Sequence, residues 1–324
     1  MHVVLFGAAG QVAQRIAREA LSRDHRVTAV VLDRNRFKTY DDRLTVVEGS
    51  ATDSDSVARV SKGADAIVSA ISPRPHPDGR SGSSLVDAAR ALIQGAKRAG
   101  VKRFIYASSS SVYGVSDAPD VTEEHPLVPL TLYNKYKGMC EPRLFTHQSP
   151  GFVCVTIRPA TLCGFAPRQR MDLSVNILTN HAINNKKITV FGGSQKRPNL
   201  HIQDMVDLYK LLLTVPDQKI AGQIFNAGFQ NMSIMEIAQI VKRVVQEVFP
   251  DKGAIPIVTT PTDDIRSYHV NSDKIQRMLG FKPNHSIEDA VRDLCAAFKA
   301  GKLPNSMDDT FYFNVRRLKS LKAA

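Results

Sequence analysis

The feature that most constrains the fold is a strand that leads directly into a glycine turn and then into a helix. The apolar run His2–Phe6 stops at Gly7-Ala-Ala-Gly10-Gln-Val-Ala13, and apolar residues at helical spacing continue over Val12–Ser22. Glycines in such a turn let the backbone approach a pyrophosphate, and the N–H groups at the helix start point at it. This placement at the first strand predicts nucleotide binding, although an ordinary tight strand–helix turn shares the pattern.

Short apolar runs alternate with helical patterns through the first 160 residues. Strands are predicted at Val27–Leu32, Leu44–Glu48, Ala66–Ala70, Arg103–Ala107 and Phe152–Ile157, and helices at Ser54–Ser61, Ser84–Ala99 and Leu132–Thr146. Such alternation is typical of βαβ units. It predicts an α/β fold with a doubly wound parallel sheet of the Rossmann type, covered by helices on both faces.

The regular alternation of predicted strands and helices ends after Pro159. Helices are predicted at Met171–Asn184, Gln203–Thr214, Ile234–Val248 and Ser286–Phe298, and one more strand of the same sheet at Ile224–Ala227. We therefore expect a nucleotide-binding domain over residues 1–160, completed by the strand near 224–228. A smaller C-terminal α/β substrate domain over residues 161–324 should pack over the ligand edge of the sheet. The Ser/Pro/Gly-rich stretch Ser72–Ser84 is predicted to be a loop.

Composition excludes several other classes. The net charge of +12 could attract nucleic acid, but the basic residues are scattered and no nucleic-acid motif accompanies them. The four cysteines and nine histidines show no zinc-ligand spacing, which predicts no metal and no disulfide framework. No apolar run approaches the length of about 18 residues that spans a membrane. We expect a cytoplasmic protein that binds neither nucleic acid nor membranes.

The end of the second predicted strand bears on the choice of dinucleotide. Asp33 stands about twenty residues after the glycine turn, where a carboxylate accepts both ribose hydroxyls and repels a 2′-phosphate. This residue favours NAD. Arg34 and Arg36 follow and could instead hold the 2′-phosphate of NADP, or could be solvated loop charges.

Tyr133 and Lys137 form a candidate catalytic pair. They are spaced i, i+4 in a predicted helix and therefore share one face. A phenol has a pKa near 10, and a nearby ammonium together with an oxidised nicotinamide would lower it. Tyr133 could then remove a hydroxyl proton from a substrate. The alternative is an ordinary surface pair.

The surroundings of this pair carry a resemblance to a known family. The motifs, in order, are Ser108-Ser-Ser-Ser-Val-Tyr-Gly114, Pro129-Leu-Thr-Leu-Tyr133-Asn-Lys-Tyr-Lys137, Ile157-Arg-Pro-Ala-Thr-Leu-Cys-Gly164, Gly192-Gly-Ser-Gln-Lys-Arg-Pro-Asn-Leu-His-Ile-Gln-Asp204, Asp264-Ile-Arg-Ser-Tyr268 and Leu279-Gly-Phe-Lys-Pro283. This series resembles the extended short-chain dehydrogenase/reductase family, with its NAD-dependent nucleotide-sugar epimerases and dehydratases. Residues 1–104 also resemble the atypical, NmrA-like members, which suggests a divergent or recombined first half.

The resemblance implies roles for individual residues. Ser109 would hydrogen-bond the reacting sugar hydroxyl, Tyr133 would be the base, and Lys137 would hold the nicotinamide ribose. The implied cofactor-binding residues are Gly7, Ala9, Gly10, Gln11, Val12, Asp33, Arg34, Ser50, Ala51, Ala70, Ile71, Tyr133, Lys137 and Pro159. The implied substrate-binding residues are Ser110, Ser111, Thr161, Asn176, Arg197 and Arg266. Ser50 stands where the family usually has an acid that contacts adenine, and Asp53 is nearby.

The residues after Ser109 separate the reaction types of the family. Dehydratases have an Asp-Glu pair there, whereas this chain has Ser110 and Ser111, which are poor general acids. The resemblance therefore implies an NAD-dependent 4-epimerase that acts on a nucleotide-diphosphate sugar through a transient 4-keto sugar. The alternatives are an NADPH-dependent keto-sugar or carbonyl reductase and a non-catalytic NAD(P) sensor. A homodimer is implied through the helices near Ser84–Ala99 and Leu132–Thr146.

Overall fold

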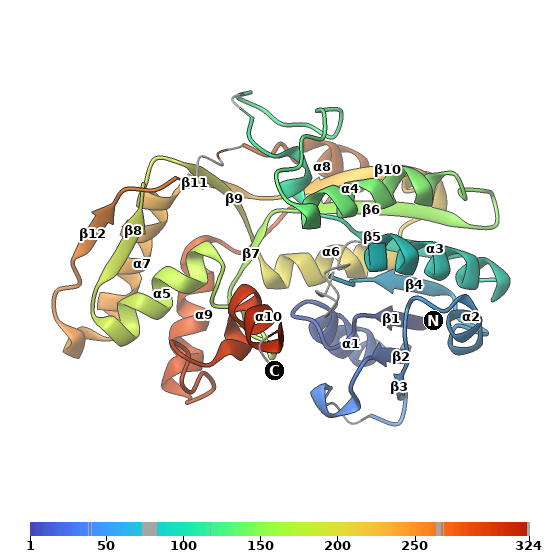
Figure 1. Ribbon diagram of the computed structural model, residues 1–324, viewed down its shortest axis with the longest axis horizontal. Coiled ribbons are helices and arrows are strands. Elements are labelled where there is room, and N and C mark those ends of the chain that lie inside the picture. The colour runs from blue at the N-terminus through green and yellow to red at the C-terminus, as the bar shows by residue number, and fades with distance from the viewer. Residues whose placement is uncertain are drawn as a thin grey trace.

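A parallel sheet forms the centre of the computed structural model (Figure 1), which describes residues 1–37, 39, 41–72, 83–116, 118–263, 267 and 269–322. Its seven strands are β1 (His2–Phe6), β2 (Arg26–Val31), β3 (Leu44–Glu48), β4 (Ala66–Ser69), β5 (Arg103–Ala107), β6 (Val153–Pro159) and β10 (Gln223–Ala227). They lie in the order β10-β6-β5-β4-β1-β2-β3. The order reverses beside β1, which is where sheets of this kind bind ligands.

Helices cover both faces of this sheet (Figure 1). Val3 and Leu5 pack in one apolar core with α1 (Ala13–Ser22), α6 (Ile202–Thr214) and α8 (Asp273–Leu279). Val4 and Phe6 point to the other face, where α2 (Ser54–Val60), α3 (Ser83–Arg98) and α4 (Leu132–Phe145) contribute to a second core. Successive strand residues point to opposite faces, so a fully apolar strand is buried on both sides. The predicted doubly wound sheet of the Rossmann type is confirmed.

The rest of the chain builds smaller sheets around a third apolar core. β7 (Thr161–Cys163), β9 (Lys196–His201) and β11 (Gln230–Ser233) form one sheet, and β8 (Ile188–Phe191) pairs with β12 (Ile257–Thr260). The helices here are α5 (Ser174–Asn185), α7 (Ile234–Val248), α9 (Ile287–Lys299) and α10 (Asn314–Lys322). The first three surround an apolar core of their own with β8. The division of the chain at residue 160 stays a prediction.

Most predicted elements are present with small shifts. The strand predicted at Ile224–Ala227 is β10, which pairs in parallel with β6 and so completes the first sheet. The helix predicted from Met171 begins only at Ser174, because Met171 donates its N–H to the carbonyl of Tyr312 and Asp172 binds Arg170. Most of the predicted loop Ser72–Ser84 lies outside the described residues. In the part of the chain that is described, no helix combines the length and apolar character needed to cross a membrane.

Candidate active site

The glycine turn after β1 has the geometry of a phosphate-binding loop. Gly7 has φ +76°, and a Cβ there would lie 2.9 Å from the carbonyl oxygen of Ala70, so a side chain cannot be accommodated. Gly10 donates its N–H to Gly7 O at 2.9 Å. α1 then begins without a side-chain cap, which leaves its start open to an anion.

Gln11 gives a second indication that a ligand belongs at this turn. Its side chain is 9% exposed, and its Nε2 has no hydrogen-bond partner. A buried donor of this kind costs free energy unless a bound group accepts its hydrogen bond. The unpartnered Gln11 amide and the uncapped start of α1 therefore fit the pyrophosphate of a dinucleotide.

The side chains after β2 are engaged with neighbouring backbone. Asp33 accepts a hydrogen bond from Asn35 N at 3.0 Å and caps the short 3-10 helix η1 (Arg34–Arg36). Arg34 donates from Nη2 to the carbonyl of Val46 in β3 at 2.6 Å. Asp53 caps α2 by accepting from Asp55 N and Ser56 N, so its carboxylate serves the helix.

A chain of hydrogen bonds joins Ser109 to α4. Ser109 caps the 3-10 helix η2 (Ser110–Tyr113), and its Oγ lies 2.7 Å from Ser111 Oγ. Ser111 Oγ donates to Asn134 Oδ1, also at 2.7 Å. Because that amide oxygen only accepts, Ser109 must donate its single hydroxyl proton to Ser111. Turning the amide over would reverse the chain and free the Ser109 proton for a substrate oxygen.

Lys137, on α4, links the ends of two strands of the sheet. It is 2% exposed, and its Nζ donates to the carbonyls of Ile71, after β4, and Ala107, at the end of β5. Burial lowers its pKa to about 8, against the opposing effects of Cys140 and Glu141. The structure thus joins the ends of β4 and β5 to α4 through one ammonium group.

The structure corrects the expectation that Lys137 lowers the pKa of Tyr133. Burial raises the pKa of the Tyr133 hydroxyl, although 38% of the residue is exposed. The charge that opposes this effect belongs to Arg170, together with a hydrogen bond to Ser72. The Lys137 ammonium is instead directed at two backbone carbonyls.

Arg170 is a residue near Tyr133 that the sequence motifs did not single out. Its guanidinium binds both oxygens of Asp172, at 2.9 and 3.1 Å, and its charge reaches Tyr133. Arg170 lies before α5, far from the tyrosine in sequence. Only the arginine-rich run Pro167-Arg-Gln-Arg170 could have drawn attention to it.

The other predicted substrate residues are spread over the site. Thr161 pairs with Asn199 in the β7–β9 ladder, and Arg197 on β9 donates from Nη1 to Lys196 O at 3.0 Å. Asn176 is fully buried, and its amide binds the backbone of Gly164 and Arg170, so it holds the loop that carries Arg170. Ser110 is buried in η2. Arg266 lies outside the described residues.

The remaining predicted cofactor residues line the C-terminal ends of strands. Ala70 and Ile71 follow β4, Pro159 ends β6, and Ser50 and Ala51 follow β3. Ser50 Oγ lies 2.7 Å from Thr52 Oγ1. Ala9 accepts a hydrogen bond from the side chain of Gln14. Their part in binding stays a prediction.

A buried network fixes η2 to the sheet. Arg158, on β6, binds both carboxylate oxygens of Glu141 on α4 and donates from Nη1 to Tyr113 Oη at 2.8 Å. Tyr113 donates in turn to Asn226 Oδ1 on β10 at 2.7 Å. Arg158 and Glu141 are each less than a twentieth exposed. The network is therefore a rigid support for Ser109.

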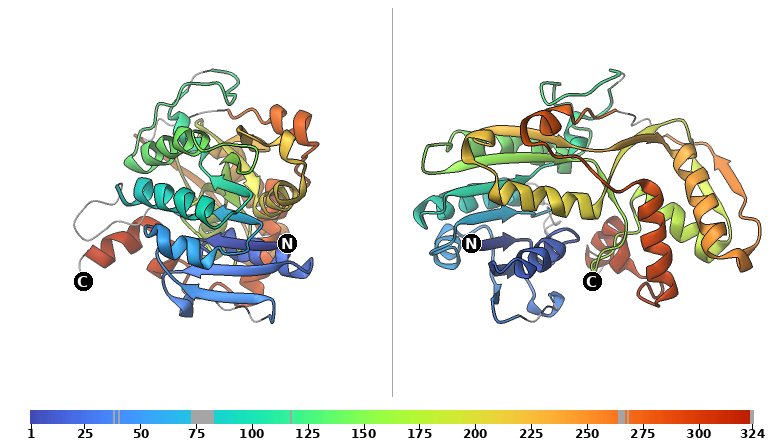
Figure 2. Two further views of the ribbon diagram at one scale, coloured as in Figure 1. Left: turned by 90° about the vertical axis from the view of Figure 1, so that its right-hand side faces the viewer. Right: turned by 180° about the vertical axis from the view of Figure 1, so that it is seen from behind.

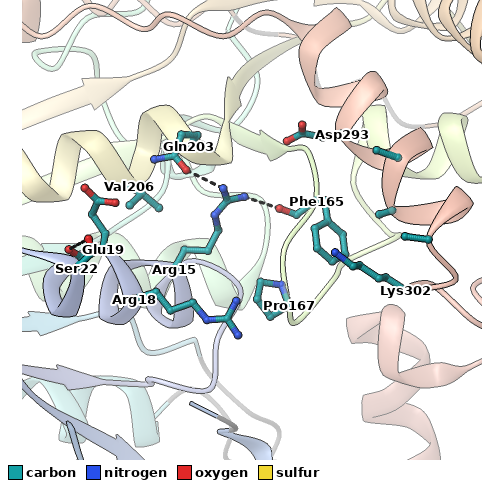
Figure 3. Close-up of a pocket in the computed structure, with 13 residues that line it drawn as sticks. Arg15, Arg18, Glu19, Ser22, Phe165, Pro167, Gln203, Val206, Asp293 and Lys302 are labelled. Atoms are coloured by element: carbon teal, nitrogen blue, oxygen red, sulfur yellow. Dashed lines mark hydrogen bonds between the residues drawn. The ribbon is translucent and has the colours of Figure 1, made fainter. Parts of the chain in front are cut away.

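Two other features involve none of the predicted site residues. A cavity of about 720 Å³ opens between α1, α6 and α9, and Arg15 spans it to Phe165 O and Gln203 Oε1 (Figure 3). No predicted site residue lines it. His201, Asp204 and His285 also cluster, but Asp204 is satisfied by Asn284 N, His285 N and the His285 ring, so this group fixes the loop before α9.

The glycine turn at the switch point and the Tyr133–Lys137 pair on α4 define a dinucleotide-dependent enzyme with a Rossmann-type fold. The chain belongs to the NAD dependent epimerase/dehydratase family, whose model matches residues 3–228. That single match spans both the first half of the chain and motifs beyond Phe104. The cofactor of the family is NAD.

Relatives with known names include both epimerases and dehydratases. A UDP-glucose 4-epimerase from Lactobacillus helveticus is 24% identical, over 90% of this chain and 94% of its own. A dTDP-D-glucose 4,6-dehydratase from Mus musculus is 28% identical, over 62% of this chain and 57% of its own. The solved UDP-glucuronic acid 4-epimerase from Bacillus cereus, in complex with UDP-glucuronic acid and NAD, has a TM-score of 0.78 and 20% identity, over 93% of this chain and 99% of its own. The structural likeness supports the fold.

Proposed function

We propose that the protein is an NAD-dependent 4-epimerase of a nucleotide-diphosphate sugar, with Ser109, Tyr133 and Lys137 as its catalytic residues. One observation carries this proposal: the hydrogen-bonded chain from Ser109 through Ser111 to Asn134, next to Tyr133, consists of hydroxyl and amide groups only. Such groups orient a substrate hydroxyl. They supply neither a strong acid nor a strong base of their own.

Tyr133 would move the proton in this reaction. It would take the proton from the sugar hydroxyl at C4 and later return it to the same oxygen, and NAD, held at the glycine turn, would supply the acceptor and donor of the C4 hydride. Burial raises the pKa of the Tyr133 phenol, and the Arg170 charge opposes this effect. A base works best when its pKa is near the operating pH, so Arg170 would help Tyr133 to act as the base.

Water elimination needs more than this set of residues. A dehydratase must remove a proton from C5 and protonate the leaving hydroxyl at C6, which calls for an additional acid and base. The nearby carboxylates are engaged elsewhere, since Glu141 binds Arg158 and Asp172 binds Arg170. Ser111 donates to Asn134. These contacts favour epimerisation over dehydration.

The decisive test follows carbon-bound hydrogen in D₂O. The purified protein is incubated with UDP-glucose and, separately, dTDP-glucose without added cofactor, and the products are identified by NMR and mass spectrometry. We expect the 4-epimer with no deuterium on carbon, because an epimerase returns the hydrogen it removed. The nucleotide released on denaturation should be NAD, at about one per chain.

Other outcomes would overturn the proposal in distinct ways. A 4-keto-6-deoxy sugar that carries solvent deuterium on carbon identifies a dehydratase. Turnover of a keto sugar that requires added NADPH identifies the exchanging reductase. The Tyr133→Phe variant serves as the inactive control in each reaction.

The finer assignments follow from the same proposal. We place the enzyme in the reducing cytoplasm, which suits its four cysteines, all free and buried. We also propose a homodimer through α3 and α4, which lie side by side on one face of the sheet (Figure 1). Light scattering of the wild type and of an Arg90→Glu variant, altered on the exposed side of α3, tests that interface.

A further inference from the structure

The segment that includes α10 docks onto the loop between β7 and α5. Asn314 at the start of α10 donates its N–H to Asp172 Oδ2 at 3.0 Å, and its side-chain oxygen accepts from Arg168 Nη2 at 2.8 Å. Met171 N–H binds Tyr312 O at 2.9 Å. Figure 1 and the right-hand view of Figure 2 draw α10 between α1 and α9.

This docking gathers four arginines, Arg36, Arg168, Arg170 and Arg317, which we call the arginine cluster. The guanidinium carbons of Arg168 and Arg317 lie 5.2 and 4.8 Å from the centroid of one ring, that of Phe311. Both oxygens of Asp172 are bound by Arg170, and Asp309 caps the short helix η5 (Thr310–Tyr312). The carboxylates near the cluster are therefore already engaged, and positive charge is in excess.

Two members of the arginine cluster show that the close approach of these positive charges is unfavourable. Burial, together with the charges of Arg170, Arg317 and Arg36, lowers the pKa of Arg168 to about 10. The pKa of Arg317 is lowered by burial and by Arg36. Arg317 Nη1 is buried and has no hydrogen-bond partner. Like charges and an unsatisfied donor in one enclosed place are stabilised by an anion.

The position of the arginine cluster, beside the glycine turn, indicates which molecule supplies the anion. Gln14, in the first turn of α1, donates from Nε2 to Ala9 O at 3.2 Å and to Arg36 O at 3.5 Å. Arg36 is thus held against the glycine turn. Arg15 of the same helix turn binds Phe165 O at 2.6 Å, which holds the Arg168 loop there as well (Figure 3).

We propose that Arg36, Arg168 and Arg317 form a phosphate subsite for the bound dinucleotide, in which α10 supplies one ligand. The guanidinium fork suits two phosphate oxygens at once. The phosphate is either the pyrophosphate common to NAD and NADP or the 2′-phosphate of NADP alone. This inference rests on dinucleotide binding in the proposed function and is independent of which sugar is converted.

The test is calorimetric titration of NAD and NADP, without sugar, into nucleotide-stripped wild type and variants. Arg317→Gln and Arg168→Gln each remove a cluster member. Arg316→Gln is the matched control, because Arg316 is the neighbour on α10 but lies exposed over Phe313 and binds Met307 O. Thermal unfolding checks that each variant is folded, and Arg317→Lys keeps the charge while it loses the fork.

We expect Arg317→Gln and Arg168→Gln to weaken dinucleotide binding by about ten- to a hundredfold, and Arg316→Gln to leave it unchanged. An equal loss for NAD and NADP identifies the pyrophosphate, and a loss for NADP alone identifies the 2′-phosphate. If folded Arg317→Gln and Arg168→Gln bind both dinucleotides as tightly as the control, the subsite is excluded. If a Gln variant is unstable, two other results together exclude the phosphate subsite. These are an unchanged dinucleotide affinity in Arg317→Lys and a dinucleotide affinity of the wild type that does not depend on salt. The sugar assay in D₂O is scored separately, so an absence of epimerisation bears only on the proposed function.

Discussion

Two regions border Tyr133, and they differ in how their polar groups are satisfied. In the catalytic wall, formed by η2 and α4, the side chains of Ser109, Ser111 and Asn134 bind one another, and Lys137 binds two carbonyls. In the arginine cluster, cations face cations, and Arg317 Nη1 has no partner. The polar groups of the wall satisfy one another without a ligand, whereas we propose that a phosphate completes the cluster. On this proposal the wall carries the chemistry, and the cluster adds a further contact to the dinucleotide.

The largest expected effect concerns the wall itself. Tyr133→Phe removes the proton carrier and should lower kcat by about 10²- to 10⁴-fold. Tyr136→Phe, three residues further along α4, is the matched control and should keep most activity. Steady-state kinetics with the identified sugar measures both variants. Full activity in Tyr133→Phe would show that the catalytic wall takes no part in the reaction.

The second largest effect is expected in the buried Arg158–Glu141 network that supports the wall, and it is measured as a loss in the free energy of unfolding. Arg158→Met leaves the buried carboxylate of Glu141 without its partner and should lower the free energy of unfolding by about 3–5 kcal/mol. Arg143→Met, on the exposed side of α4, should change it by less than about 0.5 kcal/mol. Urea unfolding measures both. The double variant Glu141→Gln/Arg158→Met should lose less than Arg158→Met alone, and a larger loss would contradict a charge left unpaired.

The buried ammonium of Lys137 predicts a pH dependence of stability. Its folded pKa of about 8 lies below its ordinary value of 10.5. Between these pH values the unfolded chain binds the proton that the folded chain lacks, so the free energy of unfolding rises with pH, by about 3 kcal/mol in total. In nucleotide-free Lys137→Met that rise should be absent, while exposed Lys135→Met keeps it. If the free energies of unfolding of the wild type and of Lys137→Met change in parallel from pH 8 to 10.5, burial does not lower the pKa of Lys137.

The smallest expected effect tests the direction of the hydroxyl chain. Asn134→Ala removes the acceptor of the Ser111 proton and should lower kcat up to about tenfold, because one hydrogen bond orients another. Asn134→Asp keeps an acceptor but can no longer turn over to become a donor. If catalysis requires the reversed chain, Asn134→Asp is slower than Asn134→Ala in single-turnover reduction of the keto sugar. Equal rates in the two variants would show that the direction has no role.

The sequence was informative where structure is local. The β1–α1 turn, Asp33 after β2, and Tyr133 with Lys137 on one helix are all encoded within a few residues, and each element is present near its predicted place. Periodicity also predicted all seven strands of the large sheet. It missed β7, β8, β9, β11 and β12, which have three to six residues and too few alternations to stand out.

The site was predictable only on the side of the catalytic wall. The contact between Arg168 and Asn314 spans 146 positions of the chain, and no motif or spacing relates two such residues. The pKa of Tyr133 depends in the same way on burial and on Arg170, which tertiary packing brings to it. Arg34 was a reasonable candidate for a phosphate ligand, but packing of η1 against β3 directs it to Val46 O.

The place of β10 in the large sheet has a consequence for biosynthesis. The chain leaves that sheet at Pro159 and returns at Gln223, where five residues of β10 pair with Val155–Pro159. Until those residues leave the ribosome, β6 presents an open edge of backbone donors and acceptors, which other strands can capture. A nascent chain cut short near residue 160 should therefore aggregate rather than persist as a separable half. The need for chaperones should be greatest during synthesis of residues 160–227.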